Sequence, residues 1–337
     1  MNDGPTLALV APEGAAGVPP ETVLLGLPII RRTVLSARRA GFGRILVVGA
    51  TEGIRTALEG TPAELTTTVP PDAVSLEWNV AVETKDLQGL LAGERTAGVP
   101  VASRSDLPRA ERSLLRGLIK DTEGFMSRHF ERKISLSVSR LLAATRVTPN
   151  QMTLISVAIG LCGAPFFFSS QPAMQTAGAL LFLSHSILDG CDGELARLKF
   201  QESRRGGLLD FWGDNVVHVA VFSAIAIGWS RISDDAWPLL CGAAAVAGTL
   251  LSATVVYRQT MAEPKEGPLF VSVAKSGESR LSRVADALSR RDFIYLVLIL
   301  SAFGKAHWFL VLAAVGAPIF FFVLVGIAAG ERAGSVS

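Results

Sequence analysis

The sequence predicts an α-helical membrane protein with six transmembrane helices, preceded by a small N-terminal α/β domain. Of its 337 residues, 49% are hydrophobic and only 18% are charged, and the mean hydropathy is +0.40. This composition is too apolar for an ordinary soluble enzyme. The apolar residues are unevenly distributed, since residues 1–150 are mixed and charged whereas residues 152–329 alternate long uncharged runs with short charged ones. A soluble part followed by a membrane part is therefore expected.

The soluble part, residues 1–115, alternates strand-like and helix-like patterns. A small layered sheet with helices follows from this alternation. The helix at Thr33–Ala40 is expected to end at Gly41 and Gly43, and a second helix is expected at Asp86–Arg95. The strand candidates are Leu7–Pro12, Ile45–Ala50, Val74–Val80 and Val99–Ala102.

Residues 116–147 are expected to form a juxtamembrane amphipathic helix. Its apolar face carries Ile134, Val138, Leu141 and Leu142, and its positive charges are Arg128, Arg132, Lys133 and Arg140. This pattern is typical of a helix that lies on an anionic membrane surface. An ordinary linker helix packed on protein is the alternative. Thr148 and Pro149 then suit the N-cap and first position of the next helix.

Residues 148–332 contain the expected spans. Six apolar runs are found there, and all but the fifth approach the roughly 20 apolar residues that a membrane crossing needs. Residues 293–329 are too long for one helix, and Gly304-Lys305 offers a turn between two. The six runs are Met152–Ser170, Ala173–Leu188, Gly207–Trp229, Ala236–Tyr257, Phe293–Phe303 and Ala306–Ala329.

The positions of Lys and Arg predict the orientation. The connections after the second and fourth runs are rich in Lys and Arg, whereas the opposite side has only Arg231 and Lys305. By the positive-inside rule, a multi-pass protein of the cytoplasmic membrane with both termini in the cytoplasm is expected. The N-terminus has no basic segment followed by a sufficient apolar stretch, so no cleavable signal peptide is expected. The net charge of +2 gives no reason to expect nucleic-acid binding.

Four aspartates stand at the edge of the second and third spans. Asp189 and Asp192 are three residues apart, and Asp210 and Asp214 are four apart, so each pair shares a helix face. Carboxylates gathered at a bilayer edge repel one another and are costly to desolvate, so a cation is expected among them. Oxygen-only ligands favour Mg²⁺, Mn²⁺ or Ca²⁺ over zinc. Because Mg²⁺ usually completes its shell with phosphate, a diphosphate substrate is implied.

Small and basic residues surround these carboxylates. The small ones leave room for a base or a phosphate chain near the helix backbone; they are Gly190, Gly193, Ala196, Gly206 and Gly207. Arg197 and Lys199 are suited to hold phosphate. The structural alternative is that these are helix-end charges and packing positions, as in many transporters.

The pattern Asp189-x2-Asp192-Gly193-x2-Ala196-Arg197-x8-Gly206-x3-Asp210-x3-Asp214 resembles the signature of the CDP-alcohol phosphotransferase family, with every fixed position filled. The resemblance covers the whole membrane half, since that family has six transmembrane helices, and it extends upstream to residue 124. This wider match is similar to members fused to an N-terminal cytidylyltransferase-like domain, including bifunctional inositol-phosphate cytidylyltransferase/phosphoinositol synthases.

The resemblance implies roles for individual residues. Asp189, Asp192 and Asp210 would ligate a pair of divalent ions, Mg²⁺ or Mn²⁺, and Asp214 would lie near the metals and act as general base. Gly193, Ala196 and Gly206 would border the cytidine, and Arg197 would position the diphosphate or the carboxylates. Arg204, Arg205, Arg258 and the segment Arg280–Arg291 could bind an acceptor phosphate, although positive-inside topology also requires them. A homodimer is implied as well.

The implied reaction is transfer from a CDP-linked alcohol, or CDP-diacylglycerol, to the hydroxyl of an acceptor alcohol with release of CMP, as in phospholipid biosynthesis in the bilayer. On the family resemblance alone, an inositol-phosphate or glycerol-phosphate acceptor is preferred. Two other classes stay open. One is a six-span transporter with an intramembrane carboxylate cluster, although no second copy of the aspartate pattern is found; the other is an inactive scaffold, although no aspartate is lost.

The soluble half departs from the family pattern. Residues 25–50 resemble the segment that follows the phosphate-binding loop of sugar-nucleotide and cytidylyltransferase domains. That loop normally holds triphosphate with glycines and nearby Arg and Lys. Here the corresponding stretch, APEGAAGVPPE, contains neither Arg nor Lys. A degenerate domain with a structural or regulatory role is expected, and the CDP-alcohol would then be made elsewhere.

Overall fold

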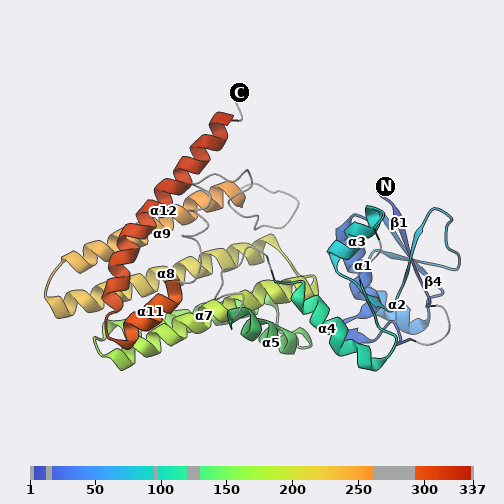
Figure 1. Ribbon diagram of the computed structural model, residues 1–337, viewed down its shortest axis with the longest axis horizontal. Coiled ribbons are helices and arrows are strands. Elements are labelled where there is room, and N and C mark those ends of the chain that lie inside the picture. Colours follow the sequence, from blue (N-terminus) through green and yellow to red (C-terminus); the bar gives the residue numbers. More distant parts are fainter. Residues whose placement is uncertain (1–3, 13–16, 95–97, 120–129, 262–292, 335–337) are drawn as a thin grey trace. The chain divides into compact units, whose positions relative to one another are not determined.

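The computed structural model describes residues 4–12, 17–94, 98–119, 130–261 and 293–334 (Figure 1). The chain divides into two compact units. The N-terminal unit comprises residues 1–121 together with 139–146 and 197–200, and the helical unit comprises the rest.

The N-terminal unit is built on a four-stranded parallel sheet. The strands are arranged in the order β5-β4-β1-β6. Their bounds are Thr6–Val10 for β1, Arg44–Val48 for β4, Ala63–Thr66 for β5 and Val74–Glu77 for β6. Leu7, Leu9, Ile45 and Val47 are almost completely buried, as expected for a parallel sheet with both faces covered. The strands predicted at Leu7–Pro12 and Ile45–Ala50 are thus β1 and β4, the two central strands of the sheet.

Four α-helices among the described residues belong to this sheet unit. They are α1 (Ile29–Ala40), α2 (Glu52–Leu58), α3 (Thr84–Leu91) and α4 (Leu107–Arg116). Helix α1 begins four residues before the predicted start and ends at Gly41, as expected. Sequence analysis missed α4, although its buried residues Ala110, Leu114 and Leu115 recur at helical spacing between charged ones, which is the pattern of an amphipathic helix. Shorter strands form two antiparallel pairs, β2 (Val23–Leu24) with β3 (Leu27–Pro28) and β7 (Val80–Ala81) with β8 (Val99–Pro100).

The helical unit has a helix at each position where a span was predicted. The elements are α5 (Arg132–Ala143), α6 (Pro149–Gly163), the 3-10 helix η3 (Ala164–Phe168), α7 (Pro172–Lys199), α8 (Arg204–Ser233), α9 (Trp237–Thr260), α11 (Phe293–Ala302) and α12 (Ala306–Gly334). A turn at Gly304 separates the last two, as the sequence predicts.

Within the described residues, four helical segments are long and apolar enough to cross a membrane. They are Pro149–Phe168, Arg204–Ser233, Trp237–Thr260 and Ala306–Gly330. The described part of helix α11 has 10 residues, and α7 ends in a charged stretch that includes Asp189, Asp192 and Glu194. Four candidate spans are therefore established, and the count of six stays a prediction.

The start of α6 is fixed by a capping box. The Thr148 hydroxyl accepts a hydrogen bond from the Gln151 backbone N–H at 3.3 Å, and the Gln151 side chain accepts one from the Thr148 N–H at 2.9 Å. Pro149 occupies the first helical position, where its missing N–H costs nothing. The predicted helix start is confirmed, and it places Thr153 on the buried face of α6.

Helices α6, α7 and α8 approach closely at Gly160. A Cβ atom there would lie 2.6 Å from Val217 Cγ1 of α8 and 3.0 Å from His185 Cγ of α7. Such contacts are too short for any larger side chain without a shift of its neighbours. Glycine thus allows the two aspartate-bearing helices to pack against the same point of α6.

Candidate active site

Three carboxylates from two helices converge in the helical unit. Asp189 comes from α7, and Asp210 and Asp214 come from the first turns of α8. One oxygen from each lies within 4.8 Å of the others. Asp189 is 3% exposed, and the other two are half-buried. The structure therefore brings together three of the four predicted aspartates.

The donors in this group suit a divalent cation. Three close negative charges repel one another unless a positive charge lies between them. The Oδ1 atom of Asp210 is buried and accepts no hydrogen bond within the described residues. Carboxylate oxygens are the ligands that hard cations such as Mg²⁺ and Mn²⁺ prefer. The residues present thus fit a bound divalent ion.

Asp192 lies outside this three-carboxylate group. Its side chain is 7% exposed, and it accepts a hydrogen bond from the Thr153 hydroxyl of α6. It is still close enough to interact electrostatically with Asp210. In the structure Asp192 links α6 to α7, and its role as a metal ligand stays a prediction.

His185 is a neighbour of the site to which sequence analysis assigned no role. Its Nε2 atom lies 3.4 Å from Asp214 Oδ1, and the residue is only 2% exposed. The ring is stacked near Phe182, with 6.2 Å between centroids. His185 precedes Asp189 by four residues, so both lie on the same face of α7. That spacing could have identified His185 as a neighbour of the site from the sequence alone.

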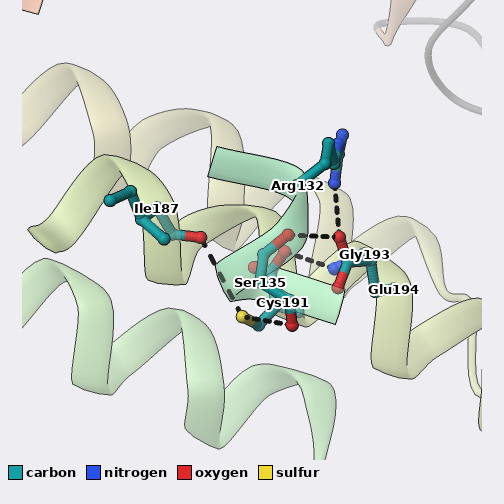
Figure 2. A network of polar contacts seen from close by, with 7 residues as sticks. Arg132, Ser135, Ile187, Cys191, Gly193 and Glu194 are labelled. Atoms are coloured by element: carbon teal, nitrogen blue, oxygen red, sulfur yellow. Dashed lines mark hydrogen bonds and ion pairs between the residues drawn. The ribbon is translucent and has the colours of Figure 1, made fainter. Parts of the chain in front are cut away.

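The opposite side of α7 is attached to α5 through Glu194. Figure 2 shows Arg132 and Ser135 of α5 directed at this carboxylate. Arg132 Nη1 lies 2.5 Å from Glu194 Oε1, and the Ser135 hydroxyl donates to the same oxygen at 2.7 Å. Glu194 is completely buried, with 0% exposure. This buried ion pair fixes where α5 packs on the helix that carries Asp189 and Asp192.

The structure corrects part of the prediction for α5. Arg132 was expected to face an anionic membrane surface, but its guanidinium pairs with Glu194 because an unpaired buried carboxylate would be costly. Ile134 and Leu141 of the predicted apolar face are 38% and 75% exposed. Lys133 is also exposed, whereas Arg140 pairs with Glu111 at 2.6 Å. Arg128 lies outside the described residues. Membrane contact by the remaining face stays a prediction.

The predicted substrate-binding residues extend the face of α7 and the start of α8. Gly193 and Ala196 follow Asp189 and Asp192 by four residues each, so they continue the same side of the helix. Gly206 lies in the first turn of α8, where its N–H donates to the capping Ser203 hydroxyl at 3.0 Å. Arg197 belongs to the segment 197–200, which is part of the N-terminal unit. Contact of these four residues with substrate stays a prediction.

The predicted acceptor-binding arginines lie at the ends of α8 and α9. Arg204 donates from Nη2 to the Met261 carbonyl oxygen at 2.6 Å, which ties the start of α8 to the end of α9. Arg205 and Arg258 are exposed. The segment 280–291 lies outside the described residues. The structure thus gives Arg204 a structural contact and leaves the acceptor role of all three a prediction.

Comparison with known proteins defines the class. Residues 146–313 match the family model described as CDP-alcohol phosphatidyltransferase. The chain is also 30% identical over 167 residues to the archaetidylinositol phosphate synthase of Pyrococcus horikoshii, a match that covers 49% of this chain and 82% of that protein. The matched region contains the three converging carboxylates. This chain belongs to the CDP-alcohol phosphatidyltransferase family.

Other similar proteins are larger or more distant. The bifunctional IPC transferase and DIPP synthase of Thermococcus kodakarensis is 39% identical over 138 residues, which is 41% of this chain but only 30% of that protein. The protein of that name from Archaeoglobus fulgidus is 37% identical over 150 residues, again 30% of its length. A solved structure of Mycobacterium tuberculosis phosphatidylinositol phosphate synthase with CDP-DAG bound shows 18% identity and a TM-score of 0.41, covering 58% of this chain and 93% of that one.

The first prediction concerns the stabilising effect of the ion pair between Arg132 of α5 and Glu194 of α7. Replacing Arg132 with Met leaves the Glu194 carboxylate buried without its cation, which typically destabilises a protein by about 3–5 kcal/mol. We expect a clear fall in the thermal unfolding temperature of the purified protein in detergent. Lys133→Met on the same helix is the control, because Lys133 is exposed. Equal unfolding temperatures for the two variants would show that the ion pair does not stabilise this packing.

Proposed function

We propose that this protein transfers a phosphoalcohol or phosphatidyl group from a CDP-linked donor to the hydroxyl of an acceptor alcohol and releases CMP. The observation that carries the proposal is the convergence of Asp189, Asp210 and Asp214 within the family-matched region. Family membership favours this transferase over the transporter and inactive-scaffold alternatives. The similarity to an archaetidylinositol phosphate synthase supports an inositol-phosphate acceptor, with glycerol phosphate as the second choice.

Two divalent ions, Mg²⁺ or Mn²⁺, are proposed to bind at the carboxylates. Asp189, Asp210 and Asp214 would hold them, and Asp192 would contribute from the same face of α7. When bound, such ions neutralise the charge of a diphosphate and make CMP a better leaving group. The small residues Gly193, Ala196 and Gly206 then leave space for the cytidine, and Arg197 supplies positive charge for the diphosphate.

Asp214 is proposed as the general base. Its carboxylate takes the proton from the acceptor hydroxyl while that oxygen forms a bond to the β-phosphorus of the donor. The bond from the β-phosphorus to the bridging oxygen breaks, and CMP leaves with its electron pair. His185, 3.4 Å from Asp214 Oδ1, is suited to orient this carboxylate toward the acceptor. Arg204, Arg205 and Arg258 are candidates for binding a phosphate on the acceptor.

The proposed organisation follows the sequence prediction. Residues 1–115 form the degenerate cytidylyltransferase-like domain, residues 116–147 the juxtamembrane segment, and residues 148–332 a six-span transferase domain. The parallel sheet supports a nucleotide-binding ancestry for the first of these, while the lack of Arg and Lys between residues 11 and 21 supports loss of its catalysis. A multi-pass homodimer with both termini in the cytoplasm completes the proposal.

The direct test is CMP release by the purified protein in detergent with Mg²⁺. CDP-diacylglycerol, CDP-glycerol and CDP-inositol would be offered in turn with inositol phosphate, glycerol phosphate and other acceptor alcohols. We expect CMP to appear only when both a donor and its matching acceptor are present, because the acceptor oxygen displaces CMP. Absence of CMP from every pair, with either Mg²⁺ or Mn²⁺, would argue against transfer to any of these acceptors.

Asp214→Asn tests the base. The amide cannot accept the proton at neutral pH, so turnover at saturating Mg²⁺ should fall by at least about 100-fold, while equilibrium binding of the CDP-linked donor under the same conditions stays close to normal. Asp235→Asn is the matched control, because this exposed aspartate follows the far end of α8. A near-normal rate for Asp214→Asn would eliminate the proposed base.

A further inference from the structure

The N-terminal unit contains a cavity lined by residues between Glu83 and Gly117. Its volume is about 550 Å³, within the range of pockets that hold small ligands. Four cationic side chains and one carboxylate line this cavity. The cations are Lys85, Arg109, Arg112 and Arg116, and the carboxylate is Glu83. This cavity has no part in the proposed transfer reaction.

The three arginines form one stripe on α4. They are spaced by three and four residues, which aligns them along a single helix face. Ala110, Leu114 and Leu115 form the buried face of the same helix, so α4 is held by its apolar side and turns the arginines outward.

These guanidinium groups have no close acidic partner within the described residues, although Asp106 is near enough to Arg109 to interact with it electrostatically. Among the described residues, none of the three arginines forms an ion pair. Arg112 donates from Nε to the Pro108 carbonyl oxygen of its own helix, at 3.0 Å. Glu111 of the same helix pairs instead with Arg140. Three like charges along one helix face destabilise each other slightly, which an anionic ligand would relieve.

Glu83 does not neutralise the arginines because it is occupied elsewhere. Its carboxylate lies 3.1 Å from Lys85 Nζ and caps the start of α3. It also packs against the backbone at Gly117, where a Cβ atom would lie 2.0 Å from Glu83 Oε2. Burial raises the pKa of this carboxyl group above its usual value.

We propose that this cavity binds a small molecule carrying at least two phosphoryl groups. Guanidinium groups bind phosphate oxygens through paired, charge-assisted hydrogen bonds, and three of them on successive turns can engage more than one phosphoryl group. The ligand is either a soluble phosphate compound or the phosphorylated headgroup of a lipid, since both present the same chemistry. The domain that lacks a cationic phosphate loop thus keeps a separate phosphate site.

The test is equilibrium binding of radiolabelled inorganic pyrophosphate to the full-length protein in detergent. EDTA is included so that no metal at the aspartate site contributes to pyrophosphate binding. Arg116→Gln should weaken binding by about tenfold, as expected for loss of a charge-assisted hydrogen bond. Arg55→Gln is the control, since it removes the same charge from an exposed position on α2. No pyrophosphate binding, or equal binding by both variants, would overturn the proposal.

Competition identifies the source of the phosphate. Displacement of pyrophosphate by CTP supports a soluble ligand, and displacement by a short-chain phosphatidylinositol phosphate supports a lipid headgroup. Displacement by sodium chloride at matched ionic strength to the same extent as by these compounds would show only non-specific charge attraction and would overturn the proposal. Thermal unfolding of Arg116→Gln beside the unmodified protein verifies that the variant is folded.

Discussion

The mutual repulsion of Asp189, Asp210 and Asp214 is the constraint on which the helical unit depends. At separations within 4.8 Å, each pair of ionised carboxylates repels by roughly 3–4 kcal/mol at an effective dielectric constant of about 20. The helices must hold the groups together against this repulsion until a cation binds. The close packing of α6, α7 and α8 at Gly160 is one contact that resists their separation.

Polar contacts on both sides of α7 keep its aspartate-bearing segment in place. On one side, Thr153 of α6 donates to Asp192, and His185 lies beside Asp214 of α8. On the other, the buried Glu194 accepts from Arg132 and Ser135 of α5 (Figure 2). Neighbouring helices thus hold a side chain on each face of α7, which suits a site whose carboxylates need a fixed geometry.

Much of this arrangement could be predicted from the spacing of residues that are close together in the sequence. The separation of Asp210 from Asp214 predicted a shared face because it equals about one helical turn, and Thr148-Pro149 predicted the start of α6 because capping depends on adjacent residues. The pairing of Arg132 with Glu194 was not predictable in this way, since the two are 62 residues apart. Asp192 matched the carboxylate pattern equally well, yet its hydroxyl partner on α6 draws it out of the three-carboxylate group.

We propose that Asp189, Asp210 and Asp214 form a divalent-metal site, and the proposed function depends on it. The most direct measurement is electron paramagnetic resonance of free Mn²⁺ during titration of the purified, EDTA-treated full-length protein. We expect the protein to remove the free Mn²⁺ signal and Mg²⁺ to restore it by competition. Asp210→Asn should bind Mn²⁺ at least about tenfold more weakly, while Asp235→Asn should bind it normally. Equal Mn²⁺ binding by Asp210→Asn and the unmodified protein would show that these carboxylates do not form the metal site.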